Sequence, residues 1–291
     1  MEERRRGTLV GSTAVLLWAT LATLTTLSGE VPPFQLLAMS FTLAFLVGVG
    51  LWVWQGRRGA AVRLRDRFRL PAAVWALGIY GLFGYHFAYF MALRLAPPVE
   101  AGLINYLWPL LIVLFAAFLP GERLHGRQIV GALLGFAGAG LIVTGGQGLS
   151  INPEYAAGYA FAVACGVIWA SYSVLSRRAR AVPTSAVGAF CGATAVLALL
   201  CHLLLEQTVW PSGGQWAAVL ALGLGPVGVA FYTWDYGVKR GDIQTLGALA
   251  YAAPLLSTGL LVALGLAEPS WVLAAAAALI TGGAVLASWK G

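Results

Sequence analysis

The stretch from Val99 to Pro109 places an amide, two aromatic rings and a proline within one apolar segment. Asn105 and Trp108 are three residues apart, so a helix puts them on one face, with Tyr106 beside them. Pro109 has no N–H to donate to the carbonyl of Asn105, which frees an acceptor. Irregular backbone is tolerated inside a bilayer where it is buried in protein or lines a watery cavity. The stretch predicts a ligand site; a proline kink packed among helices is the competing interpretation.

His86 is an ionisable side chain within another apolar segment, close to Tyr85 and Tyr89. Counting residues out to the hairpin near Leu95 and back gives His86 the same depth as Asn105. Ionisable residues inside a membrane are functional candidates by default. We therefore interpret His86 as facing a cavity, with a histidine hydrogen-bonded only within the bundle as the alternative.

Two other ionisable residues within apolar segments have structural interpretations. His202 lies near the end of a leucine-rich segment, which is typical of an interfacial position. Asp235 precedes Lys239 by four residues, a spacing that favours a salt bridge on a helix near the membrane surface. Contact of Asp235 with a ligand is the alternative.

Trp169, Tyr172, Ser173 and Ser176 share one helical face that mixes rings with hydroxyls and would suit a binding wall. For the eleven tryptophans as a whole, interfacial belts are the competing interpretation. A cavity of His, Asn, Tyr and Trp suits a zwitterion with an apolar or aromatic side chain, because rings stack while amides, phenols and helix dipoles meet its charges. A large anion such as a sugar phosphate would require Arg or Lys at depth.

The elements that must position these residues are membrane-spanning helices. The chain has 291 residues, 59% of them hydrophobic and 10% charged, with a mean hydropathy of +0.81, which excludes a soluble globular domain. Runs of about 20 apolar residues predict spanning helices. Ten are expected, at 8–27, 33–54, 71–93, 98–118, 127–145, 157–176, 184–205, 215–238, 243–265 and 270–289. Because these runs are continuous rather than alternating, the fold class is all-α and not a strand barrel.

The net charge of +7 is explained by topology rather than by nucleic acid. With the N- and C-termini in the cytoplasm, 17 of the 18 basic residues fall in cytoplasmic segments and only Arg94 lies outside. Cys165, Cys191 and Cys201 form no CxxC pair and are interpreted as small apolar packing residues. No nucleotide-binding GxxxxGK[ST] motif occurs, and we expect no metal or cofactor.

The second half of the chain repeats the first. An offset of 151 residues, and of 145 after a longer arginine-rich loop, aligns Trp18 with Trp169, Tyr106 with Tyr251, and Pro109 with Pro254. Two five-helix repeats are implied, at residues 1–146 and 157–291, joined by a linker at 147–156 within one membrane domain. Because five is odd, the repeats are inverted and their sites meet near the midplane. Pro254 is expected to free the carbonyl of Ala250 as Pro109 frees that of Asn105.

These features resemble the EamA type of the drug/metabolite transporter superfamily over essentially the whole chain. Within it, Glu100–Pro109, Ile168–Tyr172 and Tyr251–Pro254 are similar to motifs of the YddG-type aromatic amino acid exporters of bacterial inner membranes, the first being the most specific. The resemblance implies export of Phe, Tyr, Trp and related compounds, extending to Met and other apolar amino acids. It also supports Asn105, Tyr106, Trp108 and Trp169 as pathway residues. His86 lies outside these motifs, so its assignment rests on depth alone.

The sequence predicts an alternating-access exporter of amino acids with a central cavity between its repeats. The candidate substrate-binding residues are His86, Tyr89, Asn105, Tyr106, Trp108, Pro109, Trp169, Tyr172, Tyr251 and Pro254. Proton antiport usually relies on a buried carboxylate, and no span has Asp or Glu at its middle, so we expect uniport. The alternatives are a broader multidrug or metabolite exporter, with proton coupling, and more remotely a membrane-embedded enzyme.

We expect a monomer surrounded by lipid. Gly131, Gly135 and Gly138 form a stripe of small residues that permits close helix packing. We interpret the stripe as packing within the chain, with a dimer seam as the alternative.

Overall fold

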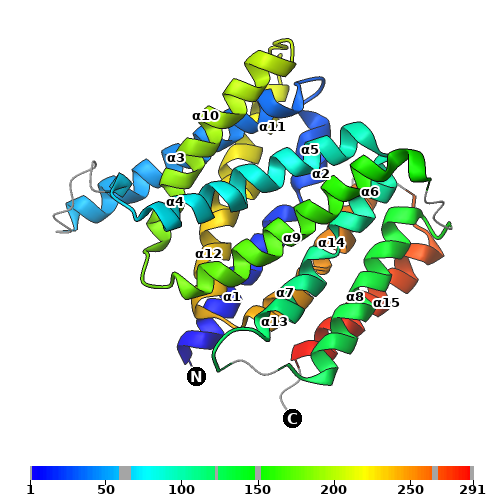
Figure 1. Ribbon diagram of the computed structural model, residues 1–291. Helices are drawn as coiled ribbons and strands as arrows, with labels where there is room; N and C mark the ends of the chain where they lie inside the picture. Colours follow the sequence, from blue (N-terminus) through cyan, green and yellow to red (C-terminus); the bar gives the residue numbers. More distant parts are fainter. Residues whose placement is uncertain (1, 59–66, 122–123, 148–151, 264–267, 289–291) are drawn as a thin grey trace.

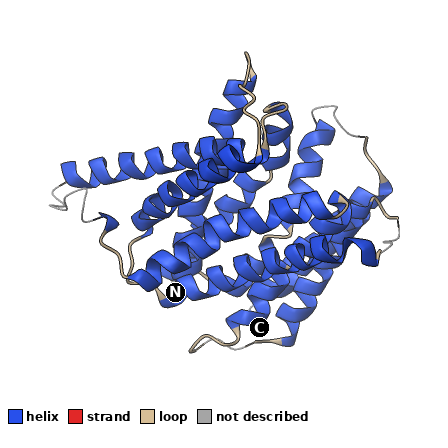
Figure 2. Cartoon of the chain, turned by 45° about the horizontal axis from the view of Figure 1, so that its top comes forward, coloured by secondary structure: helices blue, strands red, loops and turns tan. Residues whose placement is uncertain are grey.

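The computed structural model describes residues 2–58, 67–121, 124–147, 152–263 and 268–288, and all regular elements in these ranges are helices (Figure 2). Some predictions concern residues outside them. These are the last residues of the expected spans 243–265 and 270–289, part of the linker, and the basic residues Arg63, Arg65, Arg123 and Lys290.

The described helices follow the ten apolar runs in order. In the first half they are α1 (Glu2–Trp18), α2 (Leu21–Leu27), α3 (Pro33–Arg57), α4 (Ala72–Ile79), η2 (Tyr80–Gly84), α5 (Tyr85–Leu95), α6 (Pro98–Asn105), α7 (Trp108–Ala116) and α8 (Gly126–Thr144). In the second half they are η3 (Pro153–Tyr155), α9 (Ala156–Arg178), η4 (Thr184–Ala186), α10 (Val187–Leu205), α11 (Gln215–Leu224), η5 (Gly225–Val229), α12 (Ala230–Arg240), α13 (Ile243–Leu249), α14 (Ala252–Ala263) and α15 (Trp271–Ser288).

Seven helical stretches of the described chain are long and apolar enough to cross a membrane, which makes this a multi-pass membrane protein. Two shorter apolar helices cover residues 100–116 and 271–287. The expected count of ten crossings therefore stays a prediction.

Irregular turns recur at an offset of 145 residues. The π-helical turn η2 joins α4 to α5, and the π-helical turn η5 joins α11 to α12 at the corresponding residues. Two breaks also correspond: α6 ends at Asn105 and α7 begins at Trp108, while α13 ends at Leu249 and α14 begins at Ala252. A proline lies in the first turn of the helix after each break, because proline fits the first turn of a helix but not its interior. The predicted interruptions are confirmed.

Corresponding helices of the two halves lie against each other. α3 packs along α10 on one flank of the bundle and α8 packs along α15 on the other (Figure 1). Between the flanks, α1 packs along α12 in the same way that α5 packs along α9. One buried apolar cluster runs through most of these helices and places the core where the halves meet.

Glycine permits the closest helix crossings. A Cβ on Gly7 would lie 2.5 Å from the backbone nitrogen of Gly241, and a Cβ on Gly158, its repeat mate, would lie 2.6 Å from the backbone of Leu95. The stripe on α8 packs on α15 and on Tyr251, so its interpretation as internal packing is confirmed.

Replacing Gly237 by alanine should lower the thermal stability of the protein in detergent, because the new Cβ would lie 2.4 Å from the Cα of Gly11 and push α12 off α1. Overpacking of this kind costs about 1–3 kcal/mol. Gly282 is the matched control, since a Cβ there has no described atom within 4 Å. Equal melting temperatures for Gly237→Ala and Gly282→Ala would contradict the prediction.

Candidate functional site

Four tryptophans from four helices meet between the two halves. We call them the tryptophan cluster: Trp18 of α1, Trp108 of α7, Trp169 of α9 and Trp234 of α12. All six pairs of ring centroids are between 5.1 and 6.4 Å apart. Trp108 and Trp169, expected in the site from the sequence, are therefore together, and the ring of Tyr172 lies 5.4 Å from that of Trp169.

Trp234 was missed in the sequence analysis although it is fully buried. Its indole Nε1 donates a hydrogen bond to Ser173 Oγ at 3.0 Å, and that of Trp18 donates to the carbonyl of Pro226 at 3.1 Å. The repeat contained the signal, because the offset of 145 aligns Trp234 with Tyr89.

Asn105 lies beside the cluster, at the end of α6. Its Nδ2 donates to Tyr85 Oη at 3.3 Å, and its Oδ1 accepts from Cys165 Sγ at 3.0 Å. The Tyr85 ring is 5.2 Å from that of Trp169 and stacks on Tyr89 at 6.2 Å, so Asn105 and Tyr89 both connect to the cluster through Tyr85.

At the break between α6 and α7, the carbonyl of Asn105 accepts none of the described backbone hydrogen bonds. Among the described backbone bonds, Tyr106 N donates to Gly102 O and Leu107 N to Ile104 O, and Leu111 N then donates to Leu107 O. The Asn105 oxygen faces α9 at Gly166, where an added Cβ would lie 3.4 Å from it. The freed acceptor expected from Pro109 is present.

The prediction of a second free carbonyl, that of Ala250, is wrong. The carbonyl of Ala250 accepts a hydrogen bond from Ala253 N at 3.1 Å. The chain tightens into a shorter turn ahead of Pro254, which supplies the donor that the proline lacks. Pro254 itself is buried.

His86 lies in a ring of aromatic side chains. Its Nδ1 is 2.6 Å from the carbonyl of Leu82, so Nδ1 carries the proton and donates, which leaves Nε2 as the acceptor of the neutral ring. The imidazole packs edge-on against Phe41 at 5.2 Å and Phe231 at 6.0 Å. Phe231, another residue missed from the sequence, is 5.7 Å from Trp169 and joins His86 to the cluster.

Among the described ring contacts, Tyr251 and Tyr106 make none with the tryptophan cluster. Both belong to a second buried cluster, around Val113 and Ile280. Tyr251 packs over Gly135. Its hydroxyl accepts a hydrogen bond from the N–H of Leu110 at 3.1 Å, in the first turn of α7 just after Pro109. Tyr251 thus satisfies a donor that the helix break leaves unpaired. A substrate-binding role for Tyr106 or Tyr251 stays a prediction.

Asp235 and His202, for which the sequence analysis gave structural interpretations, also lie outside the tryptophan cluster. Asp235 forms the expected ion pair with Lys239 at 2.9 Å. His202 is near the end of α10 but buried, with Nδ1 3.0 Å from Glu206 Oε2 and Nε2 2.9 Å from Thr208 Oγ1.

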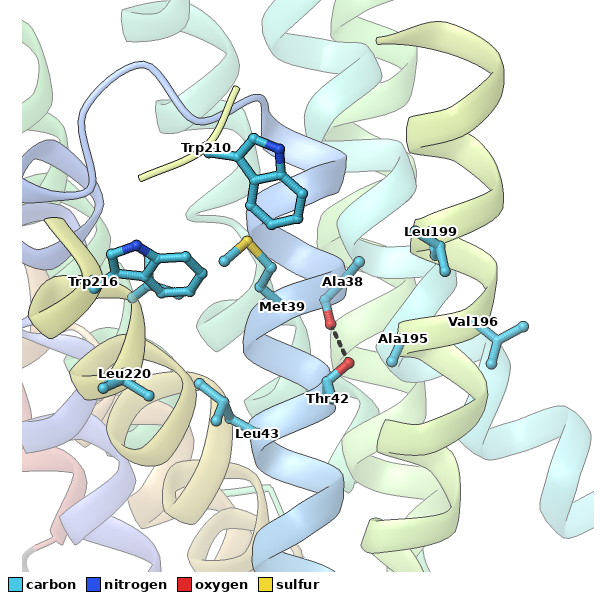
Figure 3. A pocket seen from close by; sticks show the side chains of 11 residues that line it. Ala38, Met39, Thr42, Leu43, Ala195, Val196, Leu199, Trp210, Trp216 and Leu220 are labelled. Carbon is cyan, nitrogen blue, oxygen red and sulfur yellow. Dashed lines mark hydrogen bonds between the residues drawn. The ribbon is translucent and has the colours of Figure 1, made fainter. Parts of the chain in front are cut away.

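Ring contacts fill the region where the sequence predicts an open central cavity. A groove of about 420 Å³ lies instead on the outer surface of α3, α10 and α11, under Trp210 and Trp216 (Figure 3). Its lining is apolar apart from Thr42, whose hydroxyl already donates to the carbonyl of Ala38 at 2.7 Å. The charges of a zwitterion would find no partner there, so this groove is not the candidate site.

Comparison with known proteins agrees with this architecture. The model of the EamA-like transporter family matches residues 5–144 and 156–289. A protein of Ancylobacter novellus named aromatic amino acid exporter YddG is 56% identical over 287 residues, covering 98% of both chains. A Salmonella typhimurium protein of the same name is 27% identical over 277 residues, covering 91% of this chain and 90% of its own.

The fold is also found in a solved structure. A protein crystal structure with 56% sequence identity matches with a TM-score of 0.92 and covers 98% of both chains. The family model spans most of the chain and the A. novellus relative nearly all of it. The chain belongs to the EamA-like transporter family.

Proposed function

We propose that this protein exports aromatic and other apolar amino acids across the bacterial inner membrane, by alternating access between its two halves. The observation that carries the proposal is the tryptophan cluster, in which helices of both halves bring four rings together beside the break at Asn105. The name of the relative that is 56% identical supports the same substrate class.

The chemistry of the region matches such a substrate. A contact between aromatic rings is worth about 0.5–1.5 kcal/mol beyond the area it buries, so exchanging a Trp–Trp contact for a contact with the substrate ring costs little. The Asn105 carbonyl and the Nε2 of His86 are acceptors for an ammonium group, and the Asn105 amide is a donor for a carboxylate. The packed rings must separate for a solute to enter, which requires the halves to move.

The proposed topology has ten crossings, with both termini in the cytoplasm. It is supported by the position of the first residues of α1 and the last of α15 at the same side of the bundle (Figure 1). We propose residues 1–146 and 157–291 as the two inverted repeats of one monomeric membrane domain.

Transport by this protein is proposed to be uniport. Asp235, next to Trp234 in the sequence and beside Tyr172 in a small cavity, is already paired with Lys239. A zwitterion has no net charge, so the membrane potential adds little work. If an imposed pH gradient drives uphill accumulation in proteoliposomes, and replacement of His86 abolishes it, uniport is wrong.

Counterflow into proteoliposomes tests the substrate class. Labelled Phe and Trp should exchange fastest, Met more slowly and Ala slowest, because only aromatic substrates replace the ring contacts. A multidrug or metabolite exporter is the second candidate. If free Phe and Trp fail to inhibit uptake of a flat cationic dye that the protein does transport, the amino acid proposal fails.

A further inference from the structure

The end of α9 is tied to the end of α12 by an arginine. Arg177 Nη1 donates hydrogen bonds to the carbonyl of Val238 at 3.0 Å and to that of Gly241 at 2.7 Å. These acceptors lie at the C-terminus of α12, where helix carbonyls lack intrahelical donors and the dipole is negative. Arg177 therefore caps α12 from a neighbouring helix.

A second set of bonds ties α12 to the connection between α9 and α10. Thr184 Oγ1 donates to Asp235 Oδ2 at 2.7 Å, and Lys239 Nζ donates to the carbonyl of Val182 at 3.0 Å. The side chains of Asp235 and Lys239 are only 3% and 6% exposed, so water does not compete strongly with these bonds.

At the opposite end of the bundle lie the residues that correspond to these four in the repeat. The described structure gives them no equivalent bonds. The offsets of 151 and 145 align Arg177 with Thr26, Thr184 with Pro33, Asp235 with Phe90, and Lys239 with Arg94. Pro33 and Phe90 have no polar side chain, and Thr26 and Arg94 are exposed.

Helix packing shows the same asymmetry. α12 packs against α9, whereas α5, the mate of α12, makes at most marginal contact with α1 and α2, which correspond to α9. The glycine crossings of α1 with α12 and of α9 with α5 are alike, so these crossings do not cause the difference between the two ends.

We propose that Arg177, Thr184, Asp235 and Lys239 form a cytoplasmic gate that is closed in this structure and must open for substrate to load; this rests on the proposed function. In inverted repeats, exchanging the conformations of the halves closes one side and opens the other. α12 then separates from α9 as α5 is separated from α2 here. The four hydrogen bonds between the elements break, while the ion pair of Asp235 with Lys239, which lies within α12, moves intact and leaves no buried charge alone.

Sided cysteine labelling tests the gate. Ser176 is buried on α9 and lines a small cavity with Tyr172, Asp235 and Lys239, so Ser176→Cys reports access to the inner side of the gate. The three native cysteines are replaced by serine or alanine, and a membrane-impermeant maleimide is applied to right-side-out and inside-out vesicles. Arg177→Gln and, separately, Thr184→Val should increase labelling from the cytoplasmic face several-fold without increasing labelling from the other face.

Arg178→Gln is the matched control, since it removes the same charge one residue away. Arg178 is exposed and donates to the carbonyl of Phe118, after α7, rather than to α12. Parent-like labelling of both gate variants, or equally faster labelling from both faces, overturns the gate. Counterflow of Phe by the unlabelled parent distinguishes the two proposals. If labelling increases from the cytoplasmic face but Phe shows no counterflow, the gate proposal stands and the proposed amino acid substrate is wrong.

Discussion

Replacing Trp108 by alanine should slow counterflow of Phe and Trp much more than that of Ala or Thr. Trp108 contacts Trp18, Trp169 and Trp234, and a substrate ring that enters among them would stack on it. Loss of a buried aromatic contact of this kind weakens binding by about 1–3 kcal/mol. We expect kcat/KM for aromatic substrates to fall by roughly 5- to 150-fold, the range that corresponds to this energy.

The truncation also opens a cavity, and removing a buried Trp side chain costs about 3–5 kcal/mol of stability. Transport is therefore normalised to folded protein. Trp108→Phe, which keeps a ring, should retain most of the preference for aromatic substrates. Trp271→Ala is the matched control, because Trp271 is 74% exposed. A uniform fall across Phe, Trp, Ala and Thr would reject Trp108 as a determinant of specificity.

Replacing Glu206 by alanine should give the largest loss of stability outside the tryptophan cluster. The buried carboxylate follows α10 and accepts from Phe34 N at 3.0 Å and Gln35 N at 3.1 Å, in the first turn of α3. Without it, the two backbone donors and the Nδ1 of His202 lose their partner, while the Nε2 of His202 keeps Thr208. Each buried unsatisfied donor costs about 1–3 kcal/mol, so the loss of the two backbone bonds alone should lower the free energy of unfolding by about 2–6 kcal/mol.

Thermal unfolding in detergent measures this loss. Glu206→Gln keeps an acceptor and should lose less stability than Glu206→Ala. Glu30→Ala is the matched control, because Glu30 is exposed just before the same end of α3. If Glu206→Ala and Glu30→Ala melt at the same temperature, the carboxylate does not hold α3 to α10.

The positions of the helices and of their two proline breaks could be predicted from the sequence. Apolar runs determine where helices form in a membrane, and Pro109 and Pro254 determine where two of them are interrupted. The ion pair of Asp235 with Lys239 was predictable for a similar reason, because both residues lie on one helix.

Contacts between distant helices could not be predicted in the same way. Tyr106 and Tyr251 align in the repeat, yet the hydroxyl of Tyr251 caps α7, a contact set by how α13 and α14 cross the other half. Trp234 joins the cluster only because α12 crosses α1 closely at Gly11 and Gly237.

The extent to which the centre is open is also a property of the whole fold. Two conformations of a transporter differ by a few kcal/mol, and the pattern of residue types does not record which is favoured. The sequence analysis predicted a central cavity from the types of residue at the centre. A packed centre would contain the same types, so they do not distinguish the two states.

The two π-helical turns, η2 and η5, occupy equivalent residues in the two halves. A π turn amounts to one residue inserted into an α-helix. A single ancestral insertion accounts for both turns more simply than two separate events at one position. On the proposed repeat, the inserted residue was already present in the ancestral unit before its duplication gave rise to the two halves.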